Sequence, residues 1–270
     1  MGSAADVTDW GRVAIRVDQA HEALGHRTFK AAGAVFVCNP PLADIHTANY
    51  VRSVTAGSPD EIEGLLARAE REFADCPHRC FEVDLDTPPP FEGRLVVEGY
   101  EARVWVLMVL EGELHGLPRA ADLRLVTDER GWVEADRLKK LDWAEERARL
   151  GREPIPEVGE RLALVARLKT PPDRKWLAYV DGEARGMASA WDGVDGAGQV
   201  EDVFVESEYR HRGLATALIH RCVADCRAGG AGPVVIVADA GDTPQAMYAA
   251  MGFRTVATKR RYVLYPESKH

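Results

Sequence analysis

The sequence predicts an α/β (α+β) protein: a mixed β-sheet flanked by helices, arranged as two domains in tandem. From about residue 122 to 266, strand-like and helix-like periodicities follow one another in the order β-α-α-β-β-β-α-β-α-β-β. Part of this order recurs in the first half. The 270 residues also exceed the roughly 100 to 200 of one compact domain. We therefore expect domains over residues 1–115 and 122–270, with a linker over 111–121.

The second half divides into elements at clear turn and cap signals. Asp181-Gly182 joins two strands as a hairpin, and Pro244 and Gly252 bracket a short helix that contains Tyr248. The expected strands are 122–126, 176–180, 185–191, 200–205, 234–238, 253–257 and 260–265, the last two closing the sheet. The expected helices are 131–150, 157–169, one that opens near 216 and the short one after Pro244.

The first half repeats part of this pattern. Ser58 and Glu61 have the spacing of a capping box and begin a helix that runs to about Ala74, followed by a strand at 79–83 and a helix after Pro88-Pro89-Pro90. Gly99-Tyr100 then leads into a β run, as Gly252-Phe253 does later. Ser58 to Gly99 is 41 positions and Gly213 to Gly252 is 39, so the units have nearly the same pitch.

Composition excludes several classes of function. The 34 Lys and Arg against 43 Asp and Glu give a net charge of -9, the wrong sign for general binding to nucleic acid or anionic membrane. No stretch has the roughly 20 apolar residues of a membrane span, and Met1 to Trp10 lack the features of a signal peptide, so we expect a cytoplasmic protein. Its Arg-rich, Lys-poor usage suggests a bacterial source.

Metal and hydrolase chemistry have no support in the sequence. Cys76 and Cys80, and Cys222 and Cys226, lack the second pair that a zinc site needs, so we expect buried, reduced thiols and no metal. The histidines show no metal spacing, and no Ser-His-Asp arrangement is evident.

The most informative segment is a basic turn between a strand and a helix. It reads Arg210-His211-Arg212-Gly213-Leu214-Ala215, with Thr216 near the expected helix cap. Free N–H groups and the helix dipole favour an anion there, and Gly213 has no Cβ to block close approach. The turn is neither a Walker loop nor a dinucleotide fingerprint. It predicts a pyrophosphate clamp, with a solvated surface turn as the alternative. The first-half counterpart, Ser53 to Ser58, lacks these residues, so no clamp is expected there.

Two motifs resemble the GNAT (general N-acetyltransferase) superfamily. Arg210, Gly213 and Ala215 match its Arg/Gln-x-x-Gly-x-Gly/Ala acyl-CoA loop, and Tyr248 to Phe253 is similar to its Tyr-x-x-x-Gly-Phe segment. The resemblance implies a sheet that splays between its fourth and fifth strands, and acetyl-CoA as acyl donor. Residues 1–115 would then be a divergent, incomplete GNAT-like domain that supports the active one. An unrelated α/β cap is the alternative.

The resemblance also implies roles for individual residues. The backbone of Phe204 and Val205 would follow the pantetheine arm, with Val203 as oxyanion donor, and residues 210–216 would hold the pyrophosphate. Glu201 would accept the proton of the amine and Tyr248 would protonate the leaving thiolate. Glu201 could instead be a strand-edge acid paired with an Arg, and Tyr248 a core residue.

Asp202, Asp239 and Trp191 are further candidates for substrate binding. Asp202 adjoins Glu201, but strand alternation places the two carboxylates on opposite faces unless a bulge intervenes. Asp239 and Asp242 flank the turn after the fifth strand, where they would bind an ammonium group or cap the helix, and we expect Asp242 to be the cap. Trp191 ends the third strand and would line the acceptor pocket.

The predicted function is acetyl-CoA-dependent N-acetylation of a primary amine on a small molecule, by direct attack in a ternary complex. Within the enzymes, the alternatives are a larger acyl-CoA or an acyl carrier protein as donor, or protein lysines or N-termini as acceptor. A catalytically silent CoA-binding sensor or scaffold is the alternative from another class. The chain would act as a monomer or homodimer.

Overall fold

The computed structural model describes residues 9–266, so the prediction for Met1 to Trp10 lies almost wholly outside the described residues. The first half contains α1 (Trp10–Glu22), β1 (Arg27–Ala31), β2 (Ala34–Cys38), β3 (Tyr50–Arg52), α2 (Pro59–Glu72), β4 (Arg79–Val83), α3 (Pro89–Val97) and β5 (Glu101–Leu110). The second contains β6 (Asp122–Leu125), α4 (Glu129–Arg149), α5 (Pro156–Leu168), β7 (Arg174–Val180), β8 (Glu183–Val194), β9 (Ala197–Val205), α6 (Leu214–Ala228), β10 (Val234–Asp239), α7 (Thr243–Ala250) and β11 (Arg254–Leu264). Short 3-10 turns lie at Pro40–Leu42, His46–Ala48 and Ser207–Tyr209.

All these strands form one mixed sheet in the order β1-β2-β3-β4-β11-β5-β10-β9-β8-β7-β6. Neighbouring strands are antiparallel except for β3 with β4 and β9 with β10. The fold class is therefore as predicted, and the predicted elements of the second half are present up to β10.

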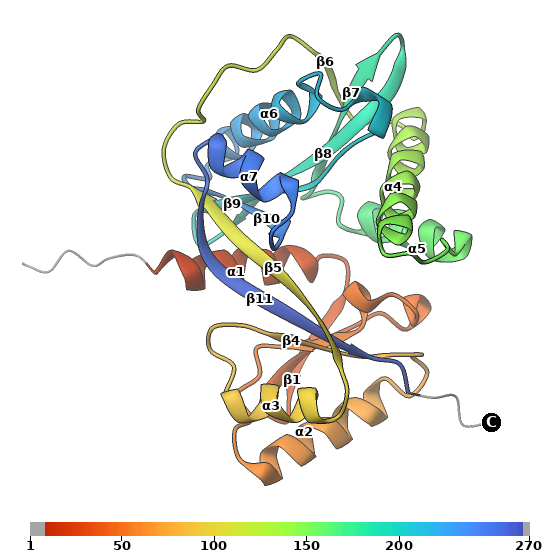
Figure 1. The fold of residues 1–270 in the computed structure, drawn as a ribbon, viewed down its shortest axis with the longest axis vertical. Helices are drawn as coiled ribbons and strands as arrows, with labels where there is room; N and C mark the ends of the chain where they lie inside the picture. The colour runs from red at the N-terminus through yellow and green to blue at the C-terminus, as the bar shows by residue number, and fades with distance from the viewer. Residues whose placement is uncertain (1–8, 267–270) are drawn as a thin grey trace, which may run out of the picture.

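Two strands cross between the halves of the chain (Figure 1). β5 lies between β10 and β11, and β11 lies between β5 and β4. The expectation of two closing strands is wrong: β11 is one strand, with a register shift between Thr255 and Ala257 against β5. Its last residues, 260–264, pair with β4, so the end of β11 joins the strands of the first half to the rest of the sheet. The division at residues 111–121 stays a prediction.

The two halves repeat the same helix endings. Gly99 and Gly252 have φ of 83° and 103°, which glycine adopts readily. In both cases the next aromatic residue closes the helix: the Tyr100 N–H donates to the Leu95 carbonyl and the Phe253 N–H to the Tyr248 carbonyl, each at 3.1 Å. The predicted echo between the halves is therefore present in the backbone.

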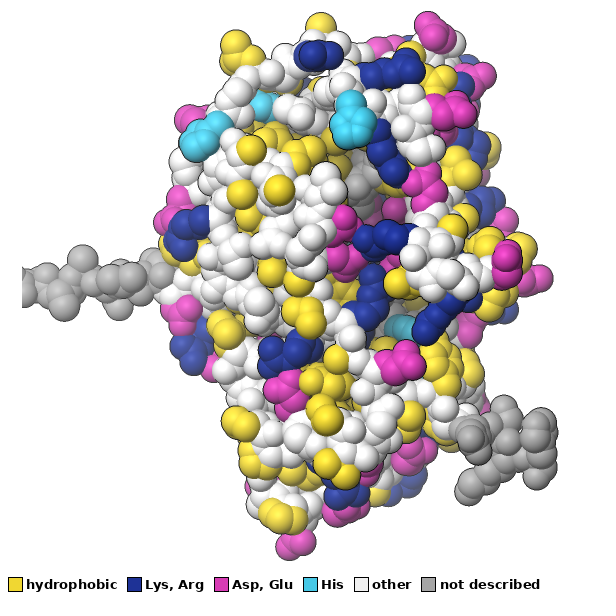
Figure 2. All heavy atoms as spheres, in the orientation of Figure 1, with side chains coloured by type: hydrophobic (Ala, Val, Ile, Leu, Met, Phe, Trp, Pro, Cys, Tyr) yellow, Lys and Arg dark blue, Asp and Glu magenta, His cyan; other side chains and the backbone are white. Residues whose placement is uncertain are grey.

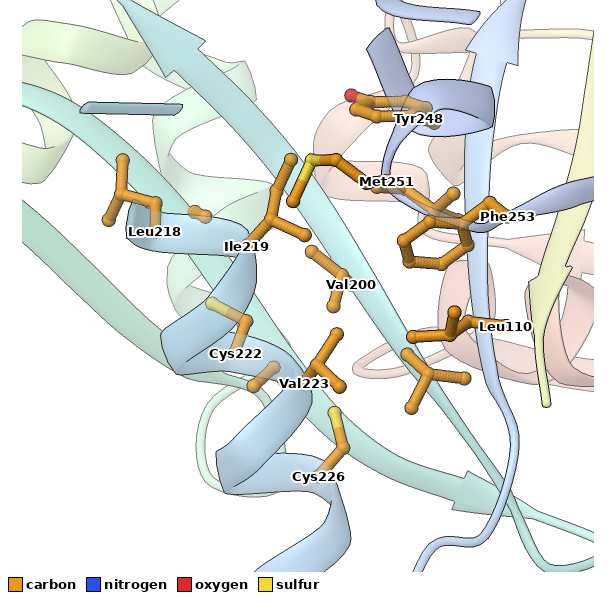
Figure 3. Packing of buried hydrophobic residues seen from close by; sticks show 14 of the residues in the cluster. Leu110, Val200, Leu218, Ile219, Cys222, Val223, Cys226, Tyr248, Met251 and Phe253 are labelled. Carbon is orange, nitrogen blue, oxygen red and sulfur yellow. The ribbon is translucent and has the colours of Figure 1, made fainter. Parts of the chain in front are cut away.

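Helices cover both faces of the second half's sheet. The core that includes α6 and α7 contains Val200, Leu218, Tyr248 and Phe253 (Figure 3). α4 packs on the opposite face through Leu138, and α1 joins it there. β9 thus contacts helices of both halves, α1 of the first and α4 and α6 of the second.

The cysteines are free thiols, and Cys38, Cys80, Cys222 and Cys226 are buried while Cys76 is half-buried. Within residues 9–266, every helix is too short or too polar to cross a membrane.

Candidate active site

The sheet splays between β9 and β10. Their parallel pairing covers only residues 198–200 of β9 with 234–236 of β10. Beyond Val200, β9 pairs with β8 alone, so Val203, Phe204 and Val205 lie on the part of the strand that has left β10. An extended ligand that needs backbone partners can enter a sheet at such a place.

A β-bulge marks the start of this splay. Asp202 has a φ of 53°, and the register against β8 shifts between the pairs Ser189–Glu201 and Met187–Phe204. The extra residue brings the Asp202 side chain to the same face as Glu201, where it meets Lys139 of α4. The sequence alone did not decide whether a bulge occurs at Asp202, and the structure contains one.

The turn before α6 presents a run of free amides. In the part of the chain that the structure describes, no acceptor takes a hydrogen bond from the backbone N–H groups of residues 211–216. His211 and Gly213 both have positive φ, of 60° and 89°, which curls the turn into a concave set of donors. Leu214 anchors the turn in the core. These donors at a helix N-terminus suit the diphosphate of coenzyme A.

Arg210 supports this turn instead of pointing freely into it. Its Nε donates to the Val205 carbonyl at 3.0 Å and its Nη2 pairs with Glu145 of α4. Arg212 donates to the Glu208 carbonyl at 2.9 Å and lies over the Tyr209 ring. The side chains therefore hold the turn in shape, while its backbone offers the anion-binding groups.

Gly213→Ala is expected to weaken acetyl-CoA binding about 10-fold. An L-residue at this φ costs on the order of 1–2 kcal/mol, so the free loop relaxes to another conformation and binding must restore the present one. The added Cβ would also lie 3.0 Å from the Arg119 side chain. Isothermal titration calorimetry measures the loss. Gly230→Ala is the matched control: its φ is 97°, it follows the other end of α6, and its Cβ would meet open space. An equal loss of affinity in that control would contradict the role of the loop.

Glu201 is a partly buried carboxylate on β9. Its Oε1 accepts a hydrogen bond from Gln199 Nε2 at 2.6 Å. Burial, together with the negative charges of Asp18 and Asp202, raises the pKa of Glu201 to about 7. Among the described residues it has no Arg or Lys ion-pair partner, whereas the neighbouring Asp202 pairs with Lys139 and Lys175. A carboxyl group with such a pKa can both accept and release a proton near neutral pH.

Asp202 is electrostatically the opposite of its neighbour. Its two oxygens accept from Lys139 Nζ at 2.9 Å and Lys175 Nζ at 2.6 Å. Although burial opposes it, these ammonium groups hold the pKa of Asp202 well below its ordinary value. The pKa values of these two adjacent carboxyl groups therefore differ: Asp202 stays ionised, and Glu201 titrates near neutrality.

Tyr248 lies at the edge of the core near the splay. Its ring packs with Phe253 at 6.1 Å between centroids, and Figure 3 shows the phenolic oxygen at the end turned away from Phe253. Burial raises the pKa of Tyr248, and the charge of Glu201 adds to the rise. The phenol is therefore protonated at neutral pH and can act as an acid.

The other predicted substrate residues are engaged within the protein. Asp239 accepts from Arg149 at 2.9 Å and from Arg103 at 3.3 Å, so it has no free charge for a substrate ammonium. Asp242 caps α7 by accepting from the Thr243 N–H at 2.7 Å, as expected, and also pairs with Arg149. Figure 2 shows a recess on the face of the molecule that it draws, with basic and acidic side chains along the edge of the recess.

Trp191 does not fit the expectation that it lines an acceptor pocket. Only 6% of the residue is exposed, and its ring lies 5.5 Å from the ring of His21 in the cluster under α1. β8 also continues past it to Val194.

The first half lacks the same chemistry at its equivalent positions. Leu95 stands where the helix ending of α7 has Tyr248. At the start of α2 the Glu61 carboxylate accepts from the N–H groups of Gly57 and Ser58, at 3.1 and 3.0 Å, and Ser58 Oγ accepts from the Glu61 N–H. The start of α2 therefore already holds a carboxylate of its own chain.

Sequence reasoning missed three residues around Glu201. Gln199 was not singled out, although its position two residues earlier on a strand places it on the same face. Asp18 of α1 and Lys169, after α5, come from distant segments and carried no signal in the sequence. Both act on the charge of Glu201.

Comparison with known proteins agrees with this geometry. Residues 135–253 match the acetyltransferase (GNAT) family. A search of the curated proteins gave no match. Among solved structures, the chain is similar to a GCN5-related N-acetyltransferase from Kribbella flavida (18% identity, 96% of each chain covered, TM-score 0.69).

Two further structures share the fold. One is a conserved protein of unknown function from Staphylococcus epidermidis, with 15% identity, 90% of this chain and 95% of that chain covered, and a TM-score of 0.68. The other is a tandem GNAT protein from the clavulanic acid biosynthesis pathway, with 14% identity, 80% and 74% covered, and a TM-score of 0.57. The motif residues 210–215 and 248–253 lie inside the matched domain. Residues 135–253 are therefore similar to the acetyltransferase (GNAT) family, and the chain shares the fold of solved GNAT proteins.

Proposed function

We propose that this protein transfers an acetyl group from acetyl-CoA to a primary amine of a small molecule, by direct attack in a ternary complex. The observation that carries the proposal is the position of Glu201. It lies where β9 leaves β10, on the strand that leads to the free amides of residues 211–216, and its pKa is about 7.

Each residue has a defined task in this proposal. The amides of 211–216 bind the diphosphate of the acyl donor, and the free backbone around Val203 offers a donor for the carbonyl oxygen of the thioester. Glu201 takes the proton that the ammonium group must lose before it attacks. Tyr248 supplies a proton to the departing sulfur. No acyl-enzyme forms, since none of these groups is placed as a nucleophile.

Thiol release from acetyl-CoA against a panel of small amines tests the function. We expect turnover with at least one amine and a lower kcat in Tyr248→Phe, because the phenylalanine ring fills the same space without a proton to give. Peptides that turn over while free amines do not would instead favour protein acetylation. Thiol release only from longer acyl-CoA thioesters or from an acyl carrier protein would identify that thioester, and not acetyl-CoA, as the acyl donor.

The same assay separates an enzyme from a silent binder. A melting temperature that rises with acetyl-CoA, without thiol release from any acceptor or donor, would favour a sensor or scaffold and overturn the proposal.

A further inference from the structure

A glutamine amide lies between two carboxylates from opposite halves of the chain. Gln199 Nε2 donates to Glu201 Oε1 at 2.6 Å and to Asp18 Oδ1 at 3.4 Å. Gln199 is 1% exposed, and its Oε1 has no hydrogen-bond partner among residues 9–266. A buried amide oxygen without a partner is costly. The orientation is nevertheless required, because two carboxylates need the two N–H groups of the amide.

Asp18 brings the first half of the chain into this arrangement. It lies on α1, is 2% exposed, and has Lys259 of β11 at its other oxygen. Glu22 of α1 and Glu82 of β4 face it as well, and burial together with these groups gives Asp18 a pKa of about 6. Asp18 is thus a second carboxyl group that titrates near neutrality, and α1 places it next to the predicted site.

Among the described residues, two acids and two donors act most strongly on the charge of Glu201. Asp18 of α1 and Asp202 of β9 favour its protonated form. Lys169, in the connection between α5 and β7, and the Gln199 amide favour its ionised form. Gln199 and Asp18 therefore act on the same carboxyl group in opposite directions.

We propose that Gln199 and Asp18 are positioning residues for the Glu201 carboxylate: the amide holds one oxygen of Glu201 in place, and the charge of Asp18, contributed by the first half, sets its proton affinity. This inference rests on the proposed function for its catalytic meaning. It assigns the first half a direct part in the site, although Leu95 stands there at the position equivalent to Tyr248.

Two substitutions should move the same titration in opposite directions. Gln199→Leu removes the donor that stabilises ionised Glu201, so the acidic limb of the kcat/KM profile should move up by about one pH unit, and the rate at pH 7 should fall by up to about 10-fold. Asp18→Asn keeps an oxygen that can accept from Gln199 but removes the negative charge. The acidic limb should then move down by about half a unit to one unit.

The pH profiles are measured by thiol release from acetyl-CoA with one amine throughout, so that the ionisation of the amine is common to all variants. Ser189→Ala is the matched control, because Ser189 pairs with Glu201 across the strands, is fully buried, and its Oγ has no partner in the described chain. Its profile should stay that of the parent protein. Shifts in the same direction for Gln199→Leu and Asp18→Asn, or no shifts, would overturn the inference.

A second readout does not depend on turnover. Carboxyl ¹³C NMR titration of labelled glutamates, with Glu201 assigned by its loss in Glu201→Gln, reports the pKa of that group directly. Opposite shifts in the titration without thiol release from any amine would sustain the arrangement and defeat the proposed function. Turnover of an amine, with the Glu201 titration unchanged in both variants, would support the proposed function and overturn the roles of Gln199 and Asp18.

Discussion

Glu201→Gln is expected to lower kcat by about 10²- to 10⁴-fold, the usual contribution of a general base. The amine is protonated at neutral pH and cannot attack until a group accepts its proton. Glutamine has nearly the shape of glutamate but no basic oxygen. Steady-state thiol release at pH 7 and at pH 9 measures the loss. At the higher pH the free amine is more abundant, so the deficit of the variant should shrink.

The variant should remain folded and still bind acetyl-CoA. Burial disfavours the charged form of Glu201, so a neutral amide removes an unfavourable group and the melting temperature at pH 8 should not fall. Glu208→Gln, an exposed carboxylate on the turn before α6, serves as the control and should keep full activity. A kcat within about three-fold of the parent for Glu201→Gln would exclude Glu201 as the base.

Local signals in the sequence were sufficient for the elements of the second half up to β10. The Asp181-Gly182 hairpin, the Pro244 helix start and the Gly252 helix end each fix a backbone conformation within a few residues, and each is where it was expected. The capping box at Ser58 is equally local. The residues before it gave no comparable signal, so α1 and strands β1 to β3 were not predicted.

Strand pairing between distant segments was beyond local reasoning. β5 and β11 are about 150 residues apart in the sequence and pair along most of their length. Their side-chain pattern is compatible with many neighbours, because alternation defines a face and not a partner. The register shift at Thr255 and the long single strand β11 follow from this pairing, which explains why two short strands were expected instead.

The candidate site was predictable where chemistry coincides with a motif. Gly213 must adopt positive φ before a helix, and the sequence marks this with a glycine. The bulge at Asp202 carries no such mark, because an aspartate there adopts positive φ only through its tertiary surroundings. The contacts of Asp18 with Gln199 and of Lys139 with Asp202 likewise join segments that only the fold brings together.

The ion cluster around Lys259 joins the two halves of the chain and supports this site. Lys259 is 3% exposed, and its Nζ contacts Asp18, Glu22 at 3.1 Å and Glu82 at 3.4 Å. Arg261 pairs with Glu22 at 2.6 Å and Glu82 at 2.9 Å. Two cations of β11 therefore contact three carboxylates of α1 and β4. Among the described residues, Lys259 is the ion-pair partner of Asp18, and Arg261 pairs only with the other two acids.

Lys259→Met is expected to lower the free energy of unfolding by about 3–5 kcal/mol, the usual cost of leaving buried charges without their partner. Methionine is unbranched like lysine and one atom shorter, so the loss reports mainly the charge. Urea denaturation followed by circular dichroism measures it. Lys30→Met is the control, because Lys30 is exposed on β1 and its change should stay within about 0.5 kcal/mol.

The pH dependence identifies the origin of that loss. Without the ammonium group, the pKa of Asp18 rises further above its unfolded value, so the folded state is favoured when Asp18 is protonated. Stability is then lost as the pH rises through the folded pKa, and Lys259→Met should be more destabilised at pH 8 than at pH 5. Adding Asp18→Asn removes the uncompensated charge and should recover part of the loss. A deficit that is equal at both pH values and unchanged in the double variant would mean that Lys259 contributes packing alone.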